Sequence, residues 1–97
     1  MNNISCIAKL EAEILLVIWD KGEATVRDVY EVILKKEMKK NKLKFTLYSS
    51  IQFNMNNLLK KNILKIDRIN KTHIYSAGMD RKELAKSMIM AVAEKLL

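Results

Sequence analysis

The sequence predicts a mainly α-helical domain that carries a small β-hairpin. Three observations support this fold class. Apolar residues recur at helical spacing in four separate segments of the 97-residue chain. A short stretch of alternating apolar and polar residues lies between the third and the fourth segment. The chain has no proline and only two glycines, which argues against a β-sandwich or long structured loops.

Composition and charge limit the classes of function. The chain is long enough for one domain, and its 49% hydrophobic residues exclude intrinsic disorder. The net charge of +7 indicates affinity for a polyanion, although charge alone does not distinguish nucleic acid from a membrane surface. No apolar run approaches the roughly 20 residues of a membrane span, so we expect no membrane partner. Because Cys6 is the only cysteine and no signal peptide is evident, we expect a cytoplasmic protein.

The first two predicted helices are amphipathic. The first is expected over residues 9–20 and ends before Gly22, which suits a left-handed C-cap. The second begins at Thr25, because its hydroxyl and the Asp28 carboxylate have the spacing of a capping box. Its apolar residues repeat at i, i+3, i+4, i+7 and i+8 as far as Leu34. The lysine-rich run that follows either continues this helix or forms a mobile loop.

The third helix has two contrasting faces. It is expected to open near Ser49, where Ser49 and Gln52 have capping-box spacing, and to end around Asn62. Its apolar face comprises Ile51, Met55, Leu58 and Leu59, and its opposite face comprises Ser49, Gln52, Phe53, Asn56, Asn57 and Lys60. No aspartate or glutamate occurs between Lys39 and Ile66. A solvated helix has no reason to exclude carboxylates, whereas a helix beside phosphates does, so this face indicates nucleic-acid binding.

A hairpin and a last helix complete the chain. Residues 63–69 alternate apolar and polar side chains, and residues 72–77 are rich in β-branched and aromatic side chains. Asn70 and the residue after it can form the tight turn between them. Asp80 and Glu83 have capping-box spacing at the start of the last helix. The apolar surface of this helix exceeds what docking on one small domain needs, which suggests a partner.

Three helices followed by a β-hairpin is the order of a winged helix-turn-helix domain, in which the third helix enters the major groove. Three segments carry a closer resemblance. AEILLVIWDKGEATVRDVYE (residues 12–31), LYSSIQFNMNNLLKKNILK (residues 47–65) and HIYSA (residues 73–77) resemble, in order and spacing, the first two helices, the recognition helix and the wing strand of the penicillinase and methicillin-resistance repressors. The resemblance covers roughly residues 10–79. It implies a transcriptional repressor that binds a palindromic promoter operator as a homodimer.

The chain departs from the family pattern in several places. Asn57 stands where the family usually has arginine, and Phe53 where it has threonine, so the operator sequence is not expected to carry over. The connection between Tyr30 and Ser49 is several residues longer than usual and mostly lysine. The chain stops at Leu97, about where the family continues into further dimerisation helices that hold the site cut by the antibiotic-responsive protease. Release by proteolysis is therefore not expected to carry over, unless the sequence is a fragment of a longer protein.

Residue chemistry and the resemblance together give candidate DNA contacts. Gln52 and Asn56 can make the bidentate amide contact to adenine, and Phe53 can touch a thymine methyl group or a sugar. Two alternatives stay open: the amides could be merely solvated, and a rotated helix could pack Phe53 inside. Serines at the helix start could hold a phosphate or only cap the helix. The full set of candidates is Tyr48, Ser49, Ser50, Gln52, Phe53, Asn56, Asn57, Lys60, Lys61, Arg68 and Lys71, with His73 as a further wing residue and Lys39, Lys40, Lys42 and Lys44 as an alternative basic patch.

The remaining predictions concern domains, cofactors and alternatives. We expect residues 1–79 to form the winged DNA-binding domain and residues 80–97 a dimerisation helix, whose contacts are assigned to Leu84, Met88, Ile89, Val92 and Leu96. A lone histidine, the absence of metal-ligand spacing and the absence of a catalytic constellation predict no metal, no cofactor and no enzyme. The alternative function is a protein–protein interaction module that uses the winged fold without sequence-specific DNA binding.

Overall fold

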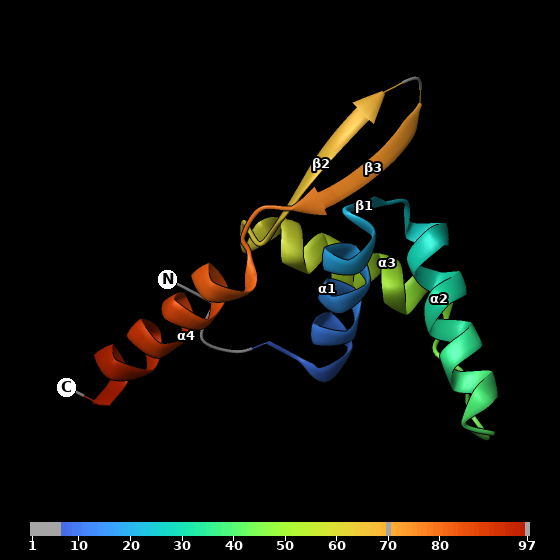
Figure 1. Ribbon diagram of the computed structural model, residues 1–97, viewed down its shortest axis with the longest axis horizontal. Helices are drawn as coiled ribbons and strands as arrows, with labels where there is room; N and C mark the ends of the chain where they lie inside the picture. Colours follow the sequence, from blue (N-terminus) through green and yellow to red (C-terminus); the bar gives the residue numbers. More distant parts are fainter. Residues whose placement is uncertain (1–6, 70, 97) are drawn as a thin grey trace.

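The computed structural model describes residues 7–69 and 71–96, except for the side chains of residue 88 and residues 90–96 (Figure 1). It is mainly helical with a small antiparallel sheet, which confirms the predicted fold class. The elements in chain order are α1 (Lys9–Lys21), β1 (Glu23–Ala24), α2 (Val26–Lys39), α3 (Tyr48–Lys60), β2 (Leu64–Ile69), β3 (Thr72–Ala77) and α4 (Arg81–Leu96).

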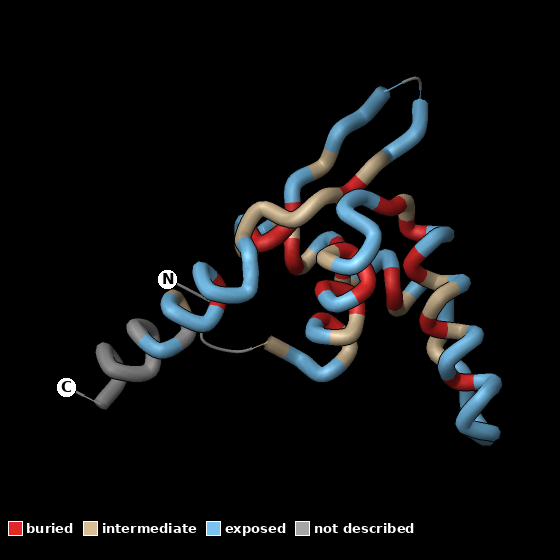
Figure 2. The backbone as a smooth tube through the Cα atoms, viewed as in Figure 1, coloured by how far each residue is buried: buried red, intermediate tan, exposed pale blue. Residues whose placement is uncertain are grey.

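The core lies where the apolar faces of the first three helices meet the base of the sheet. Ile14 and Ile18 of α1 and Ile51 and Met55 of α3 are fully buried, and Tyr75 reaches the core from β3. Buried segments are drawn red in Figure 2 and concentrate in this region. The apolar spacing read from the sequence therefore identifies the buried faces of α1 and α3 correctly.

The sheet has the strand order β1-β3-β2, with both pairings antiparallel. The hairpin of β2 and β3 pairs from Leu64 opposite Ala77 to Ile69 opposite Thr72, which confirms the predicted wing. Its far end projects away from the helices (Figure 1). The sequence did not predict β1, a two-residue strand that pairs with β3 and anchors the base of the wing beside α2.

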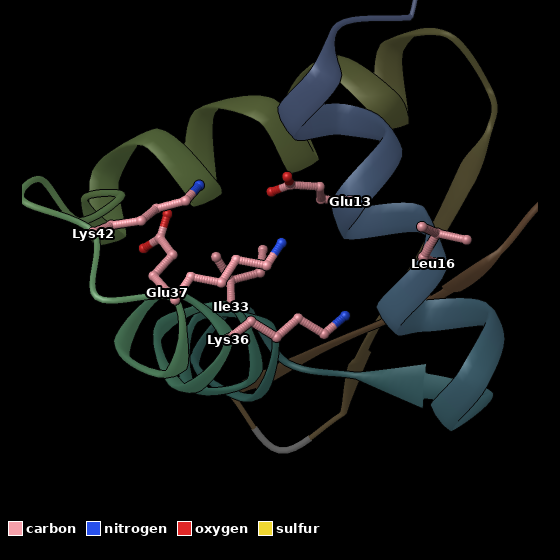
Figure 3. Close-up of a pocket in the computed structure, with 7 residues that line it drawn as sticks. Glu13, Leu16, Ile33, Lys36, Glu37 and Lys42 are labelled. Atoms are coloured by element: carbon pink, nitrogen blue, oxygen red, sulfur yellow. The ribbon is translucent and has the colours of Figure 1, made fainter.

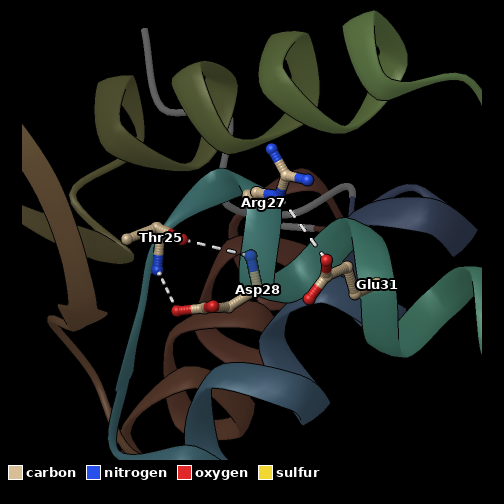
Figure 4. Close-up of polar contacts among 4 residues, drawn as sticks. All are labelled: Thr25, Arg27, Asp28 and Glu31. Atoms are coloured by element: carbon tan, nitrogen blue, oxygen red, sulfur yellow. Dashed lines mark hydrogen bonds and ion pairs between the residues drawn. The ribbon is translucent and has the colours of Figure 1, made fainter.

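Local signals at the helix ends mostly act as predicted. Gly22 ends α1 with a positive φ of 87°, and its N–H donates to the Ile18 carbonyl at 2.7 Å. At the start of α2, the Asp28 N–H donates to Thr25 Oγ1 at 3.1 Å and the Thr25 N–H donates to Asp28 Oδ2 at 3.0 Å (Figure 4). Asn62 follows α3 with a φ of 62°, the left-handed conformation expected from its sequence position.

The connection between α2 and α3 is held by one buried carboxylate. The helix α2 continues into the lysine-rich run as far as Lys39. The Glu37 carboxylate, near the end of α2, accepts hydrogen bonds from the Thr46 N–H at 2.9 Å and from Thr46 Oγ1 at 2.6 Å. Figure 3 shows Glu37 beside a cavity of about 250 Å³, with Lys42 on the same side and Glu13 of α1 across from it. The carboxylate thus fixes the chain just before α3 begins.

The last helix, α4, leaves the body of the domain after its first turns (Figure 1). Its capping box is present, because the Glu83 N–H donates to Asp80 Oδ1 at 2.7 Å and the Asp80 N–H donates to Glu83 Oε1 at 3.2 Å. Leu84 is only 7% exposed and packs in the core of its own chain, and its role as a dimer contact stays a prediction.

The other predicted dimer residues divide into two groups. Ile89 is 68% exposed, which leaves it available to a partner. The side chains of Met88, Val92 and Leu96 lie outside the described residues. Within residues 7–69 and 71–96, no helix is both long enough and apolar enough to cross a membrane.

Candidate nucleic-acid interface

The outer face of α3 is polar, exposed and free of carboxylates. Gln52, Asn56 and Lys60 are exposed, whereas Asn57 is half-buried. Phe53 is 65% exposed, which excludes the alternative of a rotated helix that packs this ring inside. The prediction that this face is directed outward is therefore confirmed.

The start of α3 differs from the sequence prediction. The helix begins at Tyr48 with Leu47 as its N-cap, and no side chain caps it, so the expected capping box of Ser49 and Gln52 is wrong. Ser49 already has helical backbone and lies within the first turn, where a side chain cannot serve as N-cap. Ser49 and Ser50 therefore lie in the first turn of the helix, and a helix start is a favourable position for an anion.

Tyr48 is positioned by a second tyrosine. Its ring meets the ring of Tyr30 in α2 edge-on, with centroids 5.4 Å apart and an interplanar angle of 70°. This arrangement is favourable for aromatic pairs and fixes the first turn of α3 against α2. Tyr48 nevertheless remains 44% exposed. Its phenol can therefore contact a partner on the outer surface of the domain.

A shallow depression joins α2, α3 and the wing. Its volume is about 220 Å³, and it lies where the start of α2, the start of α3 and the strand β3 converge. Residues from all three elements line it: Thr25, Val26, Arg27, Tyr48, Gln52, Lys71, Thr72, His73 and Tyr75. The fold thus places two separately predicted candidates, Gln52 on α3 and Lys71 on the wing, around the same depression.

Arg27 is a candidate that sequence reasoning missed. It lies in the first turn of α2, lines the depression and has a side chain that is 79% exposed. Its Nε lies 3.5 Å from Glu31 Oε2 one helical turn later (Figure 4), an exposed pair that is weak in water. A DNA phosphate could replace Glu31 as the partner of the Arg27 guanidinium at little cost in stability. Local sequence gave no reason to single out Arg27, because a helix start favours negative rather than positive side chains.

Two pKa shifts at the depression follow from local contacts. The Thr25 N–H hydrogen bond lowers the pKa of Asp28; burial opposes it, and the Thr25 hydroxyl and Lys21 add smaller lowering effects. Burial raises the pKa of Tyr75, and Arg68 opposes this effect only in part. The cap of α2 is therefore anionic at neutral pH, and the Tyr75 phenol is neutral.

The exposed end of the wing is basic. Arg68 on β2 pairs with His73 on β3, and both residues are exposed. Lys71 is exposed in the turn and has a φ of 66°. The basic patch of Lys39, Lys40, Lys42 and Lys44 is also exposed, but none of these residues lines the depression.

Lys61 does not belong to this exposed surface. Its side chain is 15% exposed, and its Nζ lies 3.0 Å from Oε1 of Glu11, which is itself buried. Separating this ion pair would leave the Glu11 carboxylate buried without a cation, so Lys61 is less available to a phosphate than an exposed lysine, and its phosphate contact stays a prediction. Lys60, its exposed neighbour, remains a candidate.

The family of the chain follows from its sequence as a whole. The sequence model of the penicillinase repressor family matches residues 7–97. The chain belongs to the penicillinase repressor family. This is a family of DNA-binding transcriptional repressors and not a class of enzymes. The resemblance seen in the three sequence segments is thereby confirmed.

Two solved structures share the fold of this penicillinase repressor family member. The solution structure of the DNA binding domain of the repressor BlaI matches with a TM-score of 0.67 at 22% identity, covering 86% of this chain and 93% of that chain. The solution structure of the Bacillus licheniformis BlaI monomeric form in complex with the blaP half-operator matches with a TM-score of 0.59 at 23% identity, with the same coverage of 86% and 93%. Among curated protein sequences, none matches the chain.

Proposed function

We propose that this penicillinase repressor binds a palindromic promoter operator as a homodimer, with α3 in the major groove and the wing along the sugar-phosphate backbone. One observation carries the proposal: the carboxylate-free outer face of α3 borders a depression whose other walls bear Arg27 and Lys71. The major groove of B-DNA, about 12 Å wide, admits one α-helix. The half-operator complex of the similar BlaI structure supports DNA as the partner.

The proposed base contacts are two amides and one ring. Gln52 and Asn56 lie one helical turn apart on the exposed face, and either amide can pair with the N6 and N7 edge of adenine. Phe53, which lies between them and is 65% exposed, suits a thymine methyl group. Asn57 is half-buried, so we assign it a smaller share of base reading than Asn56.

The proposed phosphate contacts surround these bases. Hydroxyl and N–H groups at the start of α3, together with cationic side chains on α2, α3 and the wing, would fix the register of the helix in the groove. We assign this role to Tyr48, Ser49, Ser50, Lys60, Arg68, Lys71 and the newly recognised Arg27. Such contacts carry no sequence information but dominate affinity and its dependence on salt.

The proposed dimer uses α4. Ile89 is exposed on the part of this helix that extends beyond the body of the domain, and the sequence there is rich in methionine and other apolar residues. Residues 80–97 would then join two winged domains, each of which binds one half-site. Because a repressor acts where its operator is, the proposal also places the protein in the cytoplasm. Light scattering of the free protein tests the dimer.

Membership of the penicillinase repressor family argues against the alternative of an interaction module without DNA binding. The decisive experiment is selection of bound duplexes from a random library. We expect an inverted repeat whose half-sites are about 34–36 Å apart, or a multiple of that distance. We also expect affinity to fall steeply with salt. No sequence preference together with weak salt dependence would refute the proposed function.

A further inference from the structure

The junction between the winged domain and α4 is held by Trp19. The indole Nε1 of Trp19, near the end of α1, donates a hydrogen bond to the Met79 carbonyl at 2.9 Å. The guanidinium carbon of Arg81, the first residue of α4, lies 5.3 Å from the centroid of the Trp19 ring. One side chain thus contacts both the chain that enters α4 and the first turn of the helix.

Further contacts tighten this junction on both sides. Before it, the Gly78 N–H donates to the Ile63 carbonyl at 2.7 Å, and a Cβ at this position would lie 2.9 Å from the Asn62 carbonyl oxygen. After it, Leu84 is only 7% exposed and lines an apolar groove together with Leu15 and Trp19. The capping box described above starts α4 at the junction itself, so no flexible linker separates the domain from the helix.

A helix held at three points leaves the domain in one direction. Trp19 fixes the chain at Met79, the cation–π contact fixes the first turn at Arg81, and Leu84 fixes the next turn. If α4 joins two copies of the chain, its direction relative to α3 determines how far apart the two α3 helices lie. A rigid junction then favours one half-site separation, and a loose junction tolerates several.

We propose that Trp19 is a specificity-determining residue that sets the half-site spacing accepted by the repressor. This inference rests on the proposed function, because it requires a dimer that binds an inverted repeat. Trp19 has no contact with DNA in this proposal and acts only by orienting α4. The hydrogen bond from Trp19 to Met79 corresponds to about a two- to tenfold preference for the observed orientation of α4. Removing it should therefore reduce the preference for the best half-site spacing by a similar factor.

The test compares spacings rather than affinity alone. The inverted repeat recovered by the wild-type protein is rebuilt with its half-sites moved together or apart by one and two base pairs, and an isolated half-site serves as the reference. Trp19→Phe keeps an aromatic ring but removes the N–H donor. Arg81→Met removes the cation from an exposed position, so it cannot fail through misfolding of the core. Ile18→Val, in the same helix and buried, controls for a general loss of stability.

The expected result is a flatter spacing profile. Both junction variants should lose about two- to tenfold of the preference for the best spacing, with half-site affinity unchanged and Ile18→Val behaving as wild type. Spacing profiles of Trp19→Phe and Arg81→Met identical to that of the wild type would overturn the role of Trp19 while leaving the proposed function intact. Failure of the wild-type protein to select any inverted repeat would instead overturn the proposed function, and this inference with it.

Discussion

The Nζ of Lys61 lies 3.0 Å from Oε1 and 3.1 Å from Oε2 of Glu11, and this ion pair ties the end of α3 to the first turn of α1. The two side chains are 15% and 4% exposed, so water screens the pair weakly. Glu11 also accepts the Ala8 N–H at 2.9 Å, which starts α1. The pair therefore fixes the angle of α3 relative to the rest of the core.

Lys61→Met is expected to destabilise the domain by about 3 kcal/mol, because it leaves the Glu11 carboxylate buried without a cation. Lys60→Met, at the exposed neighbouring position, should change stability by less than about 0.5 kcal/mol while weakening DNA binding. Urea unfolding of both variants measures the difference. The double variant Glu11→Gln with Lys61→Met should recover part of the loss. Equal stability of the Lys60 and Lys61 variants would contradict the structural role of the pair.

The sequence could not reveal the ion pair of Lys61, because its partner Glu11 is 50 residues away in the chain. Lys60 is the last residue of α3 and Lys61 its C-cap, so their local sequence contexts are nearly the same and only the packing of α1 against α3 distinguishes them. The burial of Leu84 within its own chain was also not predictable from local sequence. The spacing of Leu84 places it on an apolar face of α4. Because Trp19 holds the start of α4 against the domain, the first part of this face is buried in the core of the same chain.

Asn56→Ala is expected to relax base preference at one operator position, with a loss of about 1–3 kcal/mol of discrimination. Asn54→Ala is the matched control, because the Asn54 side chain donates to the Ser50 carbonyl at 2.7 Å and is engaged within the helix. Binding to a set of single-base operator variants provides the measurement. Loss of discrimination in the Asn54 variant but not in the Asn56 variant would mean that α3 presents another face to the bases.

Arg27→Ala is expected to weaken binding to all sequences alike and to reduce the slope of log affinity against log salt by about 0.9. Stability should change by less than about 0.5 kcal/mol, because the side chain is 79% exposed and its pair with Glu31 is on the surface. Arg27→Lys should retain the wild-type slope. Salt titrations of both variants on one duplex check this. An unchanged slope in Arg27→Ala would remove Arg27 from the interface.

Capping-box spacing predicted the starts of α2 and α4 correctly but not the start of α3. Thr25 with Asp28 and Asp80 with Glu83 form both reciprocal hydrogen bonds, whereas Ser49 with Gln52 has equivalent spacing and forms none. In the first two cases the capping residue directly precedes the first helical residue, Val26 or Arg81. Before Ser49, the Glu37 carboxylate holds Thr46, and the helix begins two residues earlier than a Ser49 N-cap would allow, with Leu47 as N-cap. The contact between Glu37 and Thr46 cannot be predicted from the spacing of residues at the helix start.

Glu37 should make stability depend on pH. Burial disfavours its charged form, but the two hydrogen bonds from Thr46 and the nearby Lys42 outweigh burial and lower the pKa of the Glu37 carboxyl below its ordinary value of 4.5. A carboxyl group whose pKa is lower in the folded state than in the unfolded state stabilises the fold. The full stabilisation is present when the pH is above the unfolded-state pKa, and it is lost as the pH falls through the folded-state pKa. The wild type should therefore be more stable than Glu37→Gln near neutral pH.

This stability difference should shrink as pH falls below 4.5, the ordinary value for the group. Urea unfolding of both proteins from about pH 7 to about pH 3 tests the sign of the effect. The Glu31→Gln variant, on an exposed position of the same helix, is the control and should show a much smaller dependence. A stability difference between wild type and Glu37→Gln that does not vary over this range would contradict the role of the Thr46 contact.

The most direct test of the interface follows the side-chain amide signals of α3 by NMR during titration with the selected operator duplex. The account predicts large shifts for the amide groups of Gln52 and Asn56 and little change for Asn54, which is engaged with Ser50. Side-chain amide signals of Gln52 and Asn56 that stay unchanged at saturating operator would contradict this prediction.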